Sequence, residues 1–136
     1  MTMNIQPLNS SAIKTRFAAK FLQAMKRLSK RRGMKDRYKR YRATRAAARA
    51  SLAAAVGPER AWSRAVLRRI KKRRRLSRKG GLIARTTTNP RRNLRGLVPG
   101  GKGMDYCSLL SETAHYITCL QAQVQVMKDI LHLSSP

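Results

Sequence analysis

His115 and Cys119 are the residues whose types and spacing come nearest to a chemical site. A separation of four residues on a helix places two side chains on one face, where both could ligate a metal ion. The five acidic residues and the second histidine are scattered and bring no further ligand or proton-transfer group beside them. We therefore expect an exposed, uninvolved pair, and the sequence predicts no catalytic residue, no metal site and no cofactor.

Positive charge is the strongest chemical signal in the sequence. The chain carries 32 Lys and Arg against five Asp and Glu, a net charge of +27. Residues 1–102 hold 31 of the basic side chains and two of the acidic ones, whereas residues 103–136 hold one basic and three acidic side chains. Such a basic arm repels itself and favours a polyanion. Nucleic acid is the first candidate, acidic proteins the second and anionic membrane a distant third.

The charge is densest over residues 64–79, where ten of sixteen residues are Lys or Arg. A run such as KKRRR indicates a nuclear-import signal or a nucleic-acid contact. The predicted contact residues are Arg68, Arg69, Lys71, Lys72, Arg73, Arg74 and Arg75. This segment predicts either import into the nucleus or non-specific contact with the phosphates of nucleic acid.

Helical patterns occupy the basic arm. Apolar residues recur every three or four positions over residues 12–30, and we expect this stripe to pack on the next helix or to contact a partner or an anionic surface. The alanine-rich residues 36–56 predict a second helix, ended by Gly57. A third helix is expected to begin near Pro58, and its Trp62 is predicted to anchor packing between helices, with base stacking as the alternative.

The composition limits the core that these helices can bury. Aromatic residues make up 5% of the chain, and much of its 42% hydrophobic fraction is alanine, which buries little area. We expect patches of helix and a dimerisation module instead of a compact globule. The two cysteines give no disulfide framework, and they are expected to be reduced thiols.

The clearest periodicity lies near the carboxyl end. Apolar or near-apolar residues alternate at spacings of three and four for three heptads, at Leu110, Thr113, Ile117, Leu120, Val124, Met127 and Leu131. A helix keeps such a seam on one side and needs a partner to bury it. We expect this long helix to start at Asp105, whose carboxylate suits an N-cap, and to end near Leu133.

A shorter helix and a glycine-rich loop are predicted just before the seam. Asn89 and Pro90 suit the start of a helix of about ten residues, which the Val98-Pro99 step ends. Its core-facing residues are predicted to be Leu94, Leu97 and Val98. The sequence therefore predicts an all-α chain with a helix-loop-helix and a zipper-like long second helix, preceded by basic amphipathic helices and flexible segments.

The sequence around this loop resembles a known family. LVPGG, a short loop and MDYCSLLSETAHYITCLQAQVQVM are similar to the helix-loop-helix of plant basic helix-loop-helix regulators, over about residues 91–133. The match is closest to the atypical branch without a usable basic region, and two earlier stretches also resemble that branch, AIKTRFAAKFLQAM and SLAAAVGPERAWSRAVL. The resemblance implies a nuclear regulator that inhibits growth-promoting helix-loop-helix proteins, notably in brassinosteroid signalling, and restrains cell elongation.

The resemblance also implies that the basic arm does not read bases. In the family's register, the base-contacting His, Glu and Arg fall on Leu76, Gly80 and Ala84, and none is present. A reading helix must also run unbroken into the first helix of the pair, and Gly80 and Pro90 interrupt it. We expect the chain to pair with other helix-loop-helix proteins and to withdraw them from DNA. The choice between heterodimer and homodimer stays open, and no membrane partner is expected.

These patterns divide the chain into five parts. A disordered N-terminus (1–11) precedes a basic helical region (12–79), a linker (80–88), a helix-loop-helix dimerisation domain (89–133) and a short tail (134–136). Two other functions fit the basic arm. One is a ribosomal-like RNA-binding structural protein, which does not explain the neutral seam. The other is a DNA-binding helix-loop-helix factor with an unusual site, which needs the 64–79 cluster to continue as a helix into the first helix of the pair.

Overall fold

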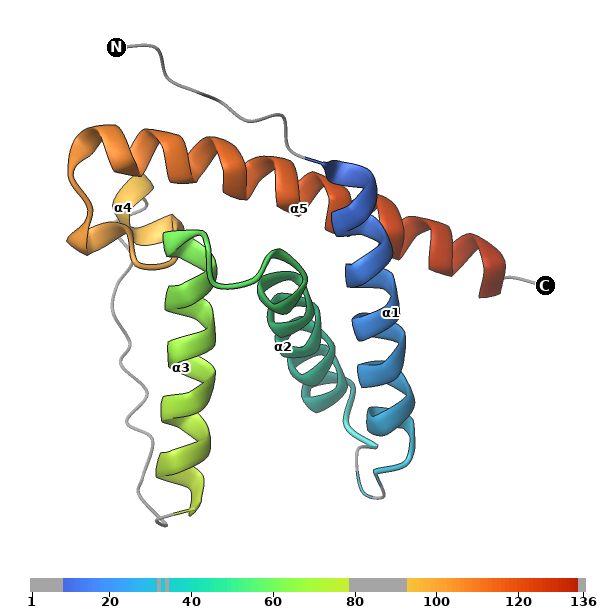
Figure 1. Ribbon diagram of the computed structural model, residues 1–136. Helices are drawn as coiled ribbons and strands as arrows, with labels where there is room; N and C mark the ends of the chain where they lie inside the picture. Colours follow the sequence, from blue (N-terminus) through green and yellow to red (C-terminus); the bar gives the residue numbers. More distant parts are fainter. Residues whose placement is uncertain (1–8, 32, 34, 79–92, 135–136) are drawn as a thin grey trace.

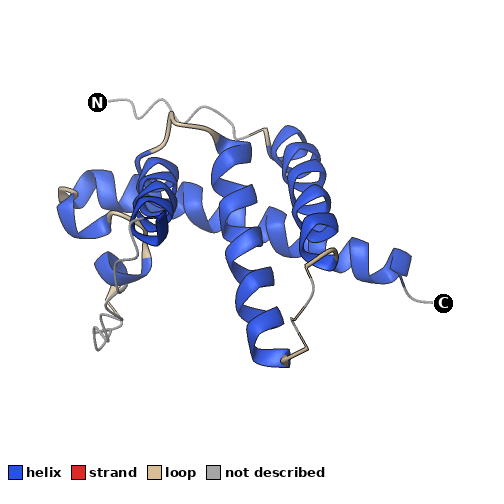
Figure 2. Ribbon diagram, turned by 90° about the horizontal axis from the view of Figure 1, so that it is seen from below, coloured by secondary structure: helices blue, strands red, loops and turns tan. Residues whose placement is uncertain are grey.

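The computed structural model describes residues 9–31, 33, 35–78 and 93–134, which form an all-α arrangement without strands in these ranges. The helices are α1 (Ser10–Ser29), α2 (Arg37–Val56), α3 (Ala61–Arg78), α4 (Leu94–Leu97) and α5 (Tyr106–Ser134), with a short 3-10 helix, η1 (Gly101–Gly103), before α5. The long α5 lies crosswise over one end of α1, α2 and α3 (Figure 1). Seen from below, the three helices project side by side from α5 (Figure 2). The predicted all-α class is confirmed.

The first two helices form a hairpin, and α1 carries a buried aromatic pair. The α1 helix begins after Asn9, whose side chain accepts a hydrogen bond from the backbone N–H of Ala12. Phe17 and Phe21 lie one turn apart with stacked rings, 5.3 Å between centroids, and both are buried. The apolar stripe of α1 therefore packs within the chain, on α2 and α5, as the sequence predicted in its first alternative.

The alanines of α2 allow close helix packing. The helix starts at an Asp36 cap and ends at Gly57, which has φ +84°, a conformation that L side chains rarely adopt. The buried residues of α2 are mostly small: Ala48, Ser51, Leu52, Ala53 and Ala55. Small side chains let α1 and α3 approach the α2 backbone. The helix therefore packs closely against both neighbours although it has little side-chain area. The following α3 starts at Ala61, three residues later than predicted.

One core joins the basic helices to α5. Buried apolar residues of α1, α2, α3 and α5 belong to a single cluster, together with Val98 of the loop. The largest fully buried side chain is Trp62, which confirms its predicted role as a packing anchor. The expectation of separate patches instead of a compact globule was wrong, because the alanines of α2 and the inward side of α5 supply packing surface that composition alone does not reveal.

The connection between α4 and α5 is shaped by two glycines. Gly100 has φ +74°, and a Cβ there would lie 3.0 Å from Cβ of Ala65 on α3. At Gly101, a Cβ would lie 2.6 Å from the carbonyl oxygen of Arg95. The Arg95 guanidinium donates hydrogen bonds to the carbonyls of Gly101 and Met104, so it holds the loop closed from inside. The loop thus sits on α3 and fixes where α5 begins.

The start of α5 agrees with the prediction, but the start of α4 does not. Asp105 accepts a hydrogen bond from the backbone N–H of Ser108, as an N-cap does, and α5 follows. The first helix of the pair is shorter than predicted. Asn93 has extended backbone (φ −95°, ψ 161°) and caps a single turn over Leu94–Leu97. The predicted start at Asn89 lies outside the described residues.

Candidate partner-binding surface

The inward face of α5 packs on the basic helices. Its buried residues are Leu109, Glu112, Thr113, Cys119, Ala122 and Val126. They lie on one side of the helix and face α1, α2 and α3, with Tyr116 and Ile130 packed beside them. This face consists largely of small or polar side chains, so it does not form a clear apolar stripe in the sequence. Of its buried residues the predicted seam includes Thr113 alone, yet this face determines which side of α5 is left open.

A polar cluster locks α3 against α5 within this face. The backbone N–H of Trp62, in the first turn of α3, donates a 3.1 Å hydrogen bond to Oε2 of Glu112. The other carboxylate oxygen of Glu112 lies 3.8 Å from the guanidinium of Arg60. Glu112 therefore caps the N-terminus of α3 from another helix, where a negative charge is favoured by the helix dipole. The indole N–H of Trp62 donates to Nδ1 of His115 at 2.9 Å.

The prediction that His115 and Cys119 form an exposed, uninvolved pair was wrong. Cys119 is fully buried, and its Sγ lies 3.6 Å from Nδ1 of His115, which is half-buried. Both residues point away from the heptad seam, as their register requires, but that direction leads into the core. No group of three or more potential metal ligands occurs among the described residues.

Burial shifts the pKa values of His115 and Cys119. Desolvation, with Arg60 nearby, lowers the pKa of His115, although Glu112 opposes the shift. The imidazole is therefore favoured in its neutral form, with Nδ1 free to accept from Trp62. Desolvation raises the pKa of Cys119 to about 11, so its thiol stays protonated at neutral pH. The cluster is a structural lock without a reactive group.

The outward face of α5 carries a row of exposed apolar side chains. Leu110, Ile117, Val124 and Leu131 follow one another at intervals of seven and are 46%, 49%, 49% and 68% exposed. We call these four residues the outward ridge. They occupy every other position of the predicted seam. Side chains at such intervals stay on one side of a helix that pairs with another helix, so the ridge has the geometry of a coiled-coil contact.

The remaining seam residues lie between the ridge and the core. Leu120 and Met127 are half-buried and pack against the core, while Thr113 is buried and its hydroxyl donates to the carbonyl of Leu109. The chain itself therefore covers one edge of the seam. Their part in contacts with a partner stays a prediction.

The short helix contributes exposed apolar side chains of its own. On α4, Leu94 is 37% and Leu97 61% exposed. Only Val98 of the predicted core-facing set is buried within the chain. The exposed leucines therefore extend the apolar surface of the ridge at the loop end of α5, where a partner helix could cover both.

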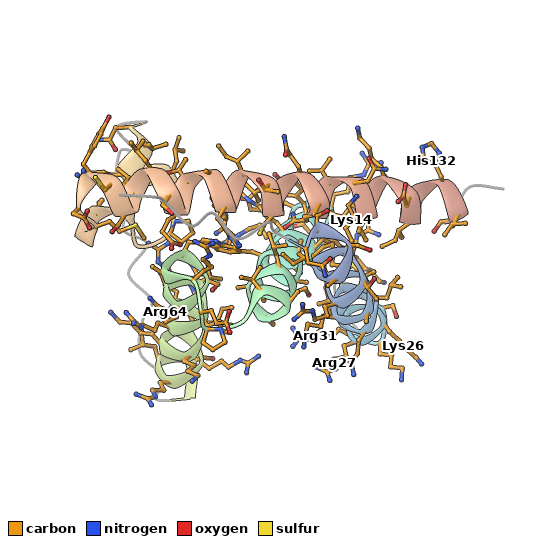
Figure 3. All side chains as sticks on the ribbon, turned by 45° about the horizontal axis from the view of Figure 1, so that its top comes forward. Lys14, Lys26, Arg27, Arg31, Arg64 and His132 are labelled. Atoms are coloured by element: carbon orange, nitrogen blue, oxygen red, sulfur yellow. The ribbon has the colours of Figure 1, made fainter. Side chains whose placement is uncertain are left out.

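The basic cluster projects away from this surface. Its predicted contact residues from Arg68 to Arg75 are exposed along α3, whose far end points away from α5. Arg64 of α3, and Lys26, Arg27 and Arg31 near the end of α1, likewise extend outward (Figure 3). Basic side chains thus gather on the projecting ends of α1 and α3, away from α5.

No continuous helix connects the basic cluster to the short helix. Of the three base-reading positions implied by the resemblance, Leu76 lies on α3, whereas Gly80 and Ala84 lie outside the described residues. The extended backbone of Asn93 separates α4 from anything before it. The alternative of a DNA-reading factor requires one helix through both elements, and Asn93 is incompatible with it. Within the described ranges, the helices offer none long and apolar enough to span a bilayer.

Comparisons with known proteins match both halves of this architecture. Residues 10–74, which include α1, α2 and most of α3, match the family described as IBH1-like, N-terminal domain. The chain is 34% identical over 167 residues to Transcription factor IBH1 of Oryza sativa subsp. japonica, an alignment that covers 93% of this chain and 81% of that protein. Transcription factor IBH1 of Oryza sativa subsp. indica matches with the same identity and coverage. No solved structure matches the chain.

Proposed function

Because the chain belongs to the IBH1 family and is a transcription regulator, we propose that it acts by pairing with other helix-loop-helix proteins through the outward ridge of α5. The observation that carries the proposal is the seven-residue repeat of exposed apolar side chains, among which Ile117 and Val124 are each half-exposed at the centre of the helix. Burying the exposed half of such a side chain favours association by about 1 kcal/mol. The exposed leucines of α4 add to the same surface.

The pairing has a defined consequence for DNA binding by the partner. A helix-loop-helix dimer contacts its DNA site with one basic helix from each subunit. This chain supplies no reading helix, since the base-contacting pattern is missing and Asn93 breaks the helix before α4. Loss of two or three bidentate base contacts, at about 1–3 kcal/mol each, lowers affinity by at least about thirtyfold. The chain therefore acts as a negative regulator that sequesters DNA-binding partners.

The biological setting follows from the family and the basic cluster. Import into the nucleus is assigned to the exposed residues from Arg68 to Arg75 on α3. We propose that the sequestered partners are helix-loop-helix activators of cell elongation, notably those that act in brassinosteroid signalling, and the resemblance to atypical growth-inhibiting regulators supports this. This mechanism needs no catalysis by the chain, because occupancy of the partner's pairing surface is sufficient to prevent the partner from binding DNA.

A DNA-binding titration tests the mechanism. An active helix-loop-helix partner is held at fixed concentration with its consensus site, and the chain is added at constant salt, beside a scrambled site. We expect the chain to remove the partner from the consensus site without binding either DNA specifically. If both DNAs are shifted equally, the positive charge dominates and the chain is a general nucleic-acid binder. A supershifted complex selective for the consensus site contradicts the proposal.

Two charge insertions localise the effect to the ridge. Ile117→Asp together with Val124→Asp places two carboxylates at the centre of the ridge, and the inhibition should be lost. Ser111→Asp together with Gln125→Asp adds the same charge to exposed polar positions of α5 and should retain the inhibition. Persistent partner binding by the ridge variant, with helical content unchanged by circular dichroism, would show that pairing uses another surface.

A further inference from the structure

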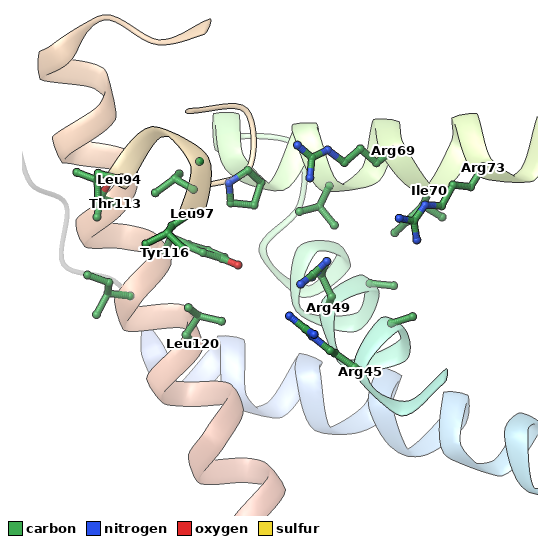
Figure 4. Close-up of a pocket in the computed structure, with 17 residues that line it drawn as sticks. Arg45, Arg49, Arg69, Ile70, Arg73, Leu94, Leu97, Thr113, Tyr116 and Leu120 are labelled. Atoms are coloured by element: carbon green, nitrogen blue, oxygen red, sulfur yellow. The ribbon is translucent and has the colours of Figure 1, made fainter. Parts of the chain in front are cut away.

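A groove that shares Ile117 with the ridge is rimmed by four arginines. It has a volume of about 640 Å³ and lies between α2, α3, the α4 segment and α5. Arg45 and Arg49 lie one turn apart on α2, and Arg69 and Arg73 one turn apart on α3. The four side chains reach into the space between these helices (Figure 4). We call this space the arginine-rimmed groove.

The floor of the groove is apolar. It includes Val66 and Ile70 of α3, Leu97 of α4 and Leu120 of α5, with the ring of Tyr116 among them. Leu97 is 61% exposed, so part of this apolar surface faces solvent. A ligand made only of phosphates and sugars would cover these side chains without a compensating apolar contact. The floor therefore favours an occupant that also brings apolar side chains.

The positive charge of the rim has no internal counter-charge. All five acidic side chains of the chain lie in the described residues, and the ion pair recorded among those residues joins Arg60 to Glu112. The four rim arginines are exposed, and no ion pair involves them. Arginine pairs with carboxylates through two parallel hydrogen bonds, so acidic side chains on both flanks of a ligand would match the two rows.

We propose that the arginine-rimmed groove binds an acidic amphipathic helix of a partner protein, with apolar residues on the floor and Asp or Glu on both flanks. Helices that bind in grooves insert apolar residues at intervals of three and four. A second copy of this chain does not fit, because two chains of charge +27 repel and each has only five carboxylates to offer. The groove shares Ile117, Leu94 and Leu97 with the pairing surface. The proposal therefore rests on that function and goes beyond it in one respect: α2 and α3 supply an arginine rim, which selects an acidic occupant.

A synthetic peptide tests the proposal on the full chain. The probe is a fluorescent helix of about 20 residues, long enough to be partly helical alone, with Leu on one stripe and Glu beside it. Three competitors are used: a peptide of the same composition with the Leu stripe dispersed, a peptide with Lys in place of Glu, and a single-stranded DNA oligonucleotide. We expect the striped acidic peptide to bind at least tenfold more tightly than the other two peptides.

Matched charge reversals locate the binding. Arg45→Glu with Arg49→Glu reverses one row of the rim on α2, and peptide affinity should fall at least tenfold. Arg16→Glu with Lys20→Glu reverses two exposed charges one turn apart on α1, makes the same change in net charge, and should keep the affinity within about twofold. The exposed positions make both variants compatible with the fold, which circular dichroism verifies.

Three outcomes overturn the proposal. Equal losses in the two reversed variants would mean that the peptide senses net charge alone. Equal binding of the dispersed peptide, or stronger competition by DNA with a steep salt dependence, would identify the groove as a general polyanion site. The ridge variant Val124→Asp separates this test from the pairing test, because Val124 does not line the groove. Its peptide affinity should be unchanged while pairing is weakened.

Discussion

The indole Nε1–H of Trp62 donates a 2.9 Å hydrogen bond to Nδ1 of His115, and this bond joins α3 to α5. The two residues are 53 positions apart in the sequence. Since Trp62 is fully buried and the acceptor must be a neutral imidazole, the contact depends on the protonation state of a single side chain. It couples the packing of α3 on α5 to pH.

Acidification should destabilise the fold through His115. Its pKa is lowered by burial from 6.5, so the unfolded chain binds this proton more readily than the folded chain does. The stability that the neutral imidazole of His115 contributes is complete above about pH 6.5. It is lost as the pH falls from there through the pKa of His115 in the folded chain. We expect the Tm to fall by a few degrees between about pH 7.5 and pH 5.5, measured by circular dichroism.

Two histidine variants separate this effect from general titration. His115→Gln keeps a hydrogen-bond acceptor that does not titrate, and it should flatten the dependence of the Tm between those pH values. His132→Gln removes the other histidine, which is exposed near the end of α5, and it should leave the dependence as in the wild type. A wild-type pH response retained by His115→Gln would assign the effect to other groups.

Removal of the Glu112 carboxylate should weaken the junction of α3 and α5. In Glu112→Ala the backbone N–H of Trp62 stays buried without its acceptor, and Arg60 loses its carboxylate. A buried donor without a partner costs about 1–3 kcal/mol, which urea denaturation measures as a lower midpoint. Glu59→Ala, which removes an exposed carboxylate, should change the free energy of unfolding by less than about 0.5 kcal/mol. Equal effects of the two variants would refute the capping role.

Local patterns allowed much of the helical architecture to be predicted. Asp105 was expected to cap α5, and it does, because a cap depends on residues within one turn of each other. Gly57 ends α2 for a similarly local reason, since a positive φ favours glycine. The heptad repeat gave the row through Ile117 and Val124, which the structure leaves exposed. That exposure agrees with a partner surface, although the partner itself stays a proposal.

The contacts across the core could not be predicted in this way. Cys119 and Ala122 have little hydrophobic area, so the inward face of α5 does not stand out from polar solvent-facing positions until α3 is placed against it. The bond from Trp62 to His115 spans 53 residues and leaves no periodic trace in the sequence. The arginine-rimmed groove likewise depends on the angle between α2 and α3, and Arg45 and Arg49 alone resemble an ordinary charged helix surface.

Substitution of Gly100 or Gly101 by alanine should destabilise the fold, whereas the same substitution at Gly103 should not. Gly101→Ala places a methyl group 2.6 Å from the carbonyl oxygen of Arg95, a backbone atom that cannot move freely. Gly100→Ala forces alanine into a positive φ of +74° and places its methyl group 3.0 Å from Cβ of Ala65. Each should lower the free energy of unfolding by about 1–3 kcal/mol. Gly103→Ala meets nothing within 4 Å and should be nearly neutral. Urea denaturation ranks the three, and comparable losses would mean that loop geometry is not limiting.

The two cysteines should differ in their reaction with an alkylating agent. Cys107 is exposed near the start of α5, whereas Cys119 is buried, and its raised pKa of about 11 keeps the thiolate scarce. At about pH 8, mass spectrometry should show one modified thiol in the folded chain and two after denaturation. Cys107→Ser should show none until the chain unfolds. Rapid modification of Cys119 in folded Cys107→Ser would mean that α5 detaches from α3 in solution, and the ridge would then not be the only face of α5 available to a partner.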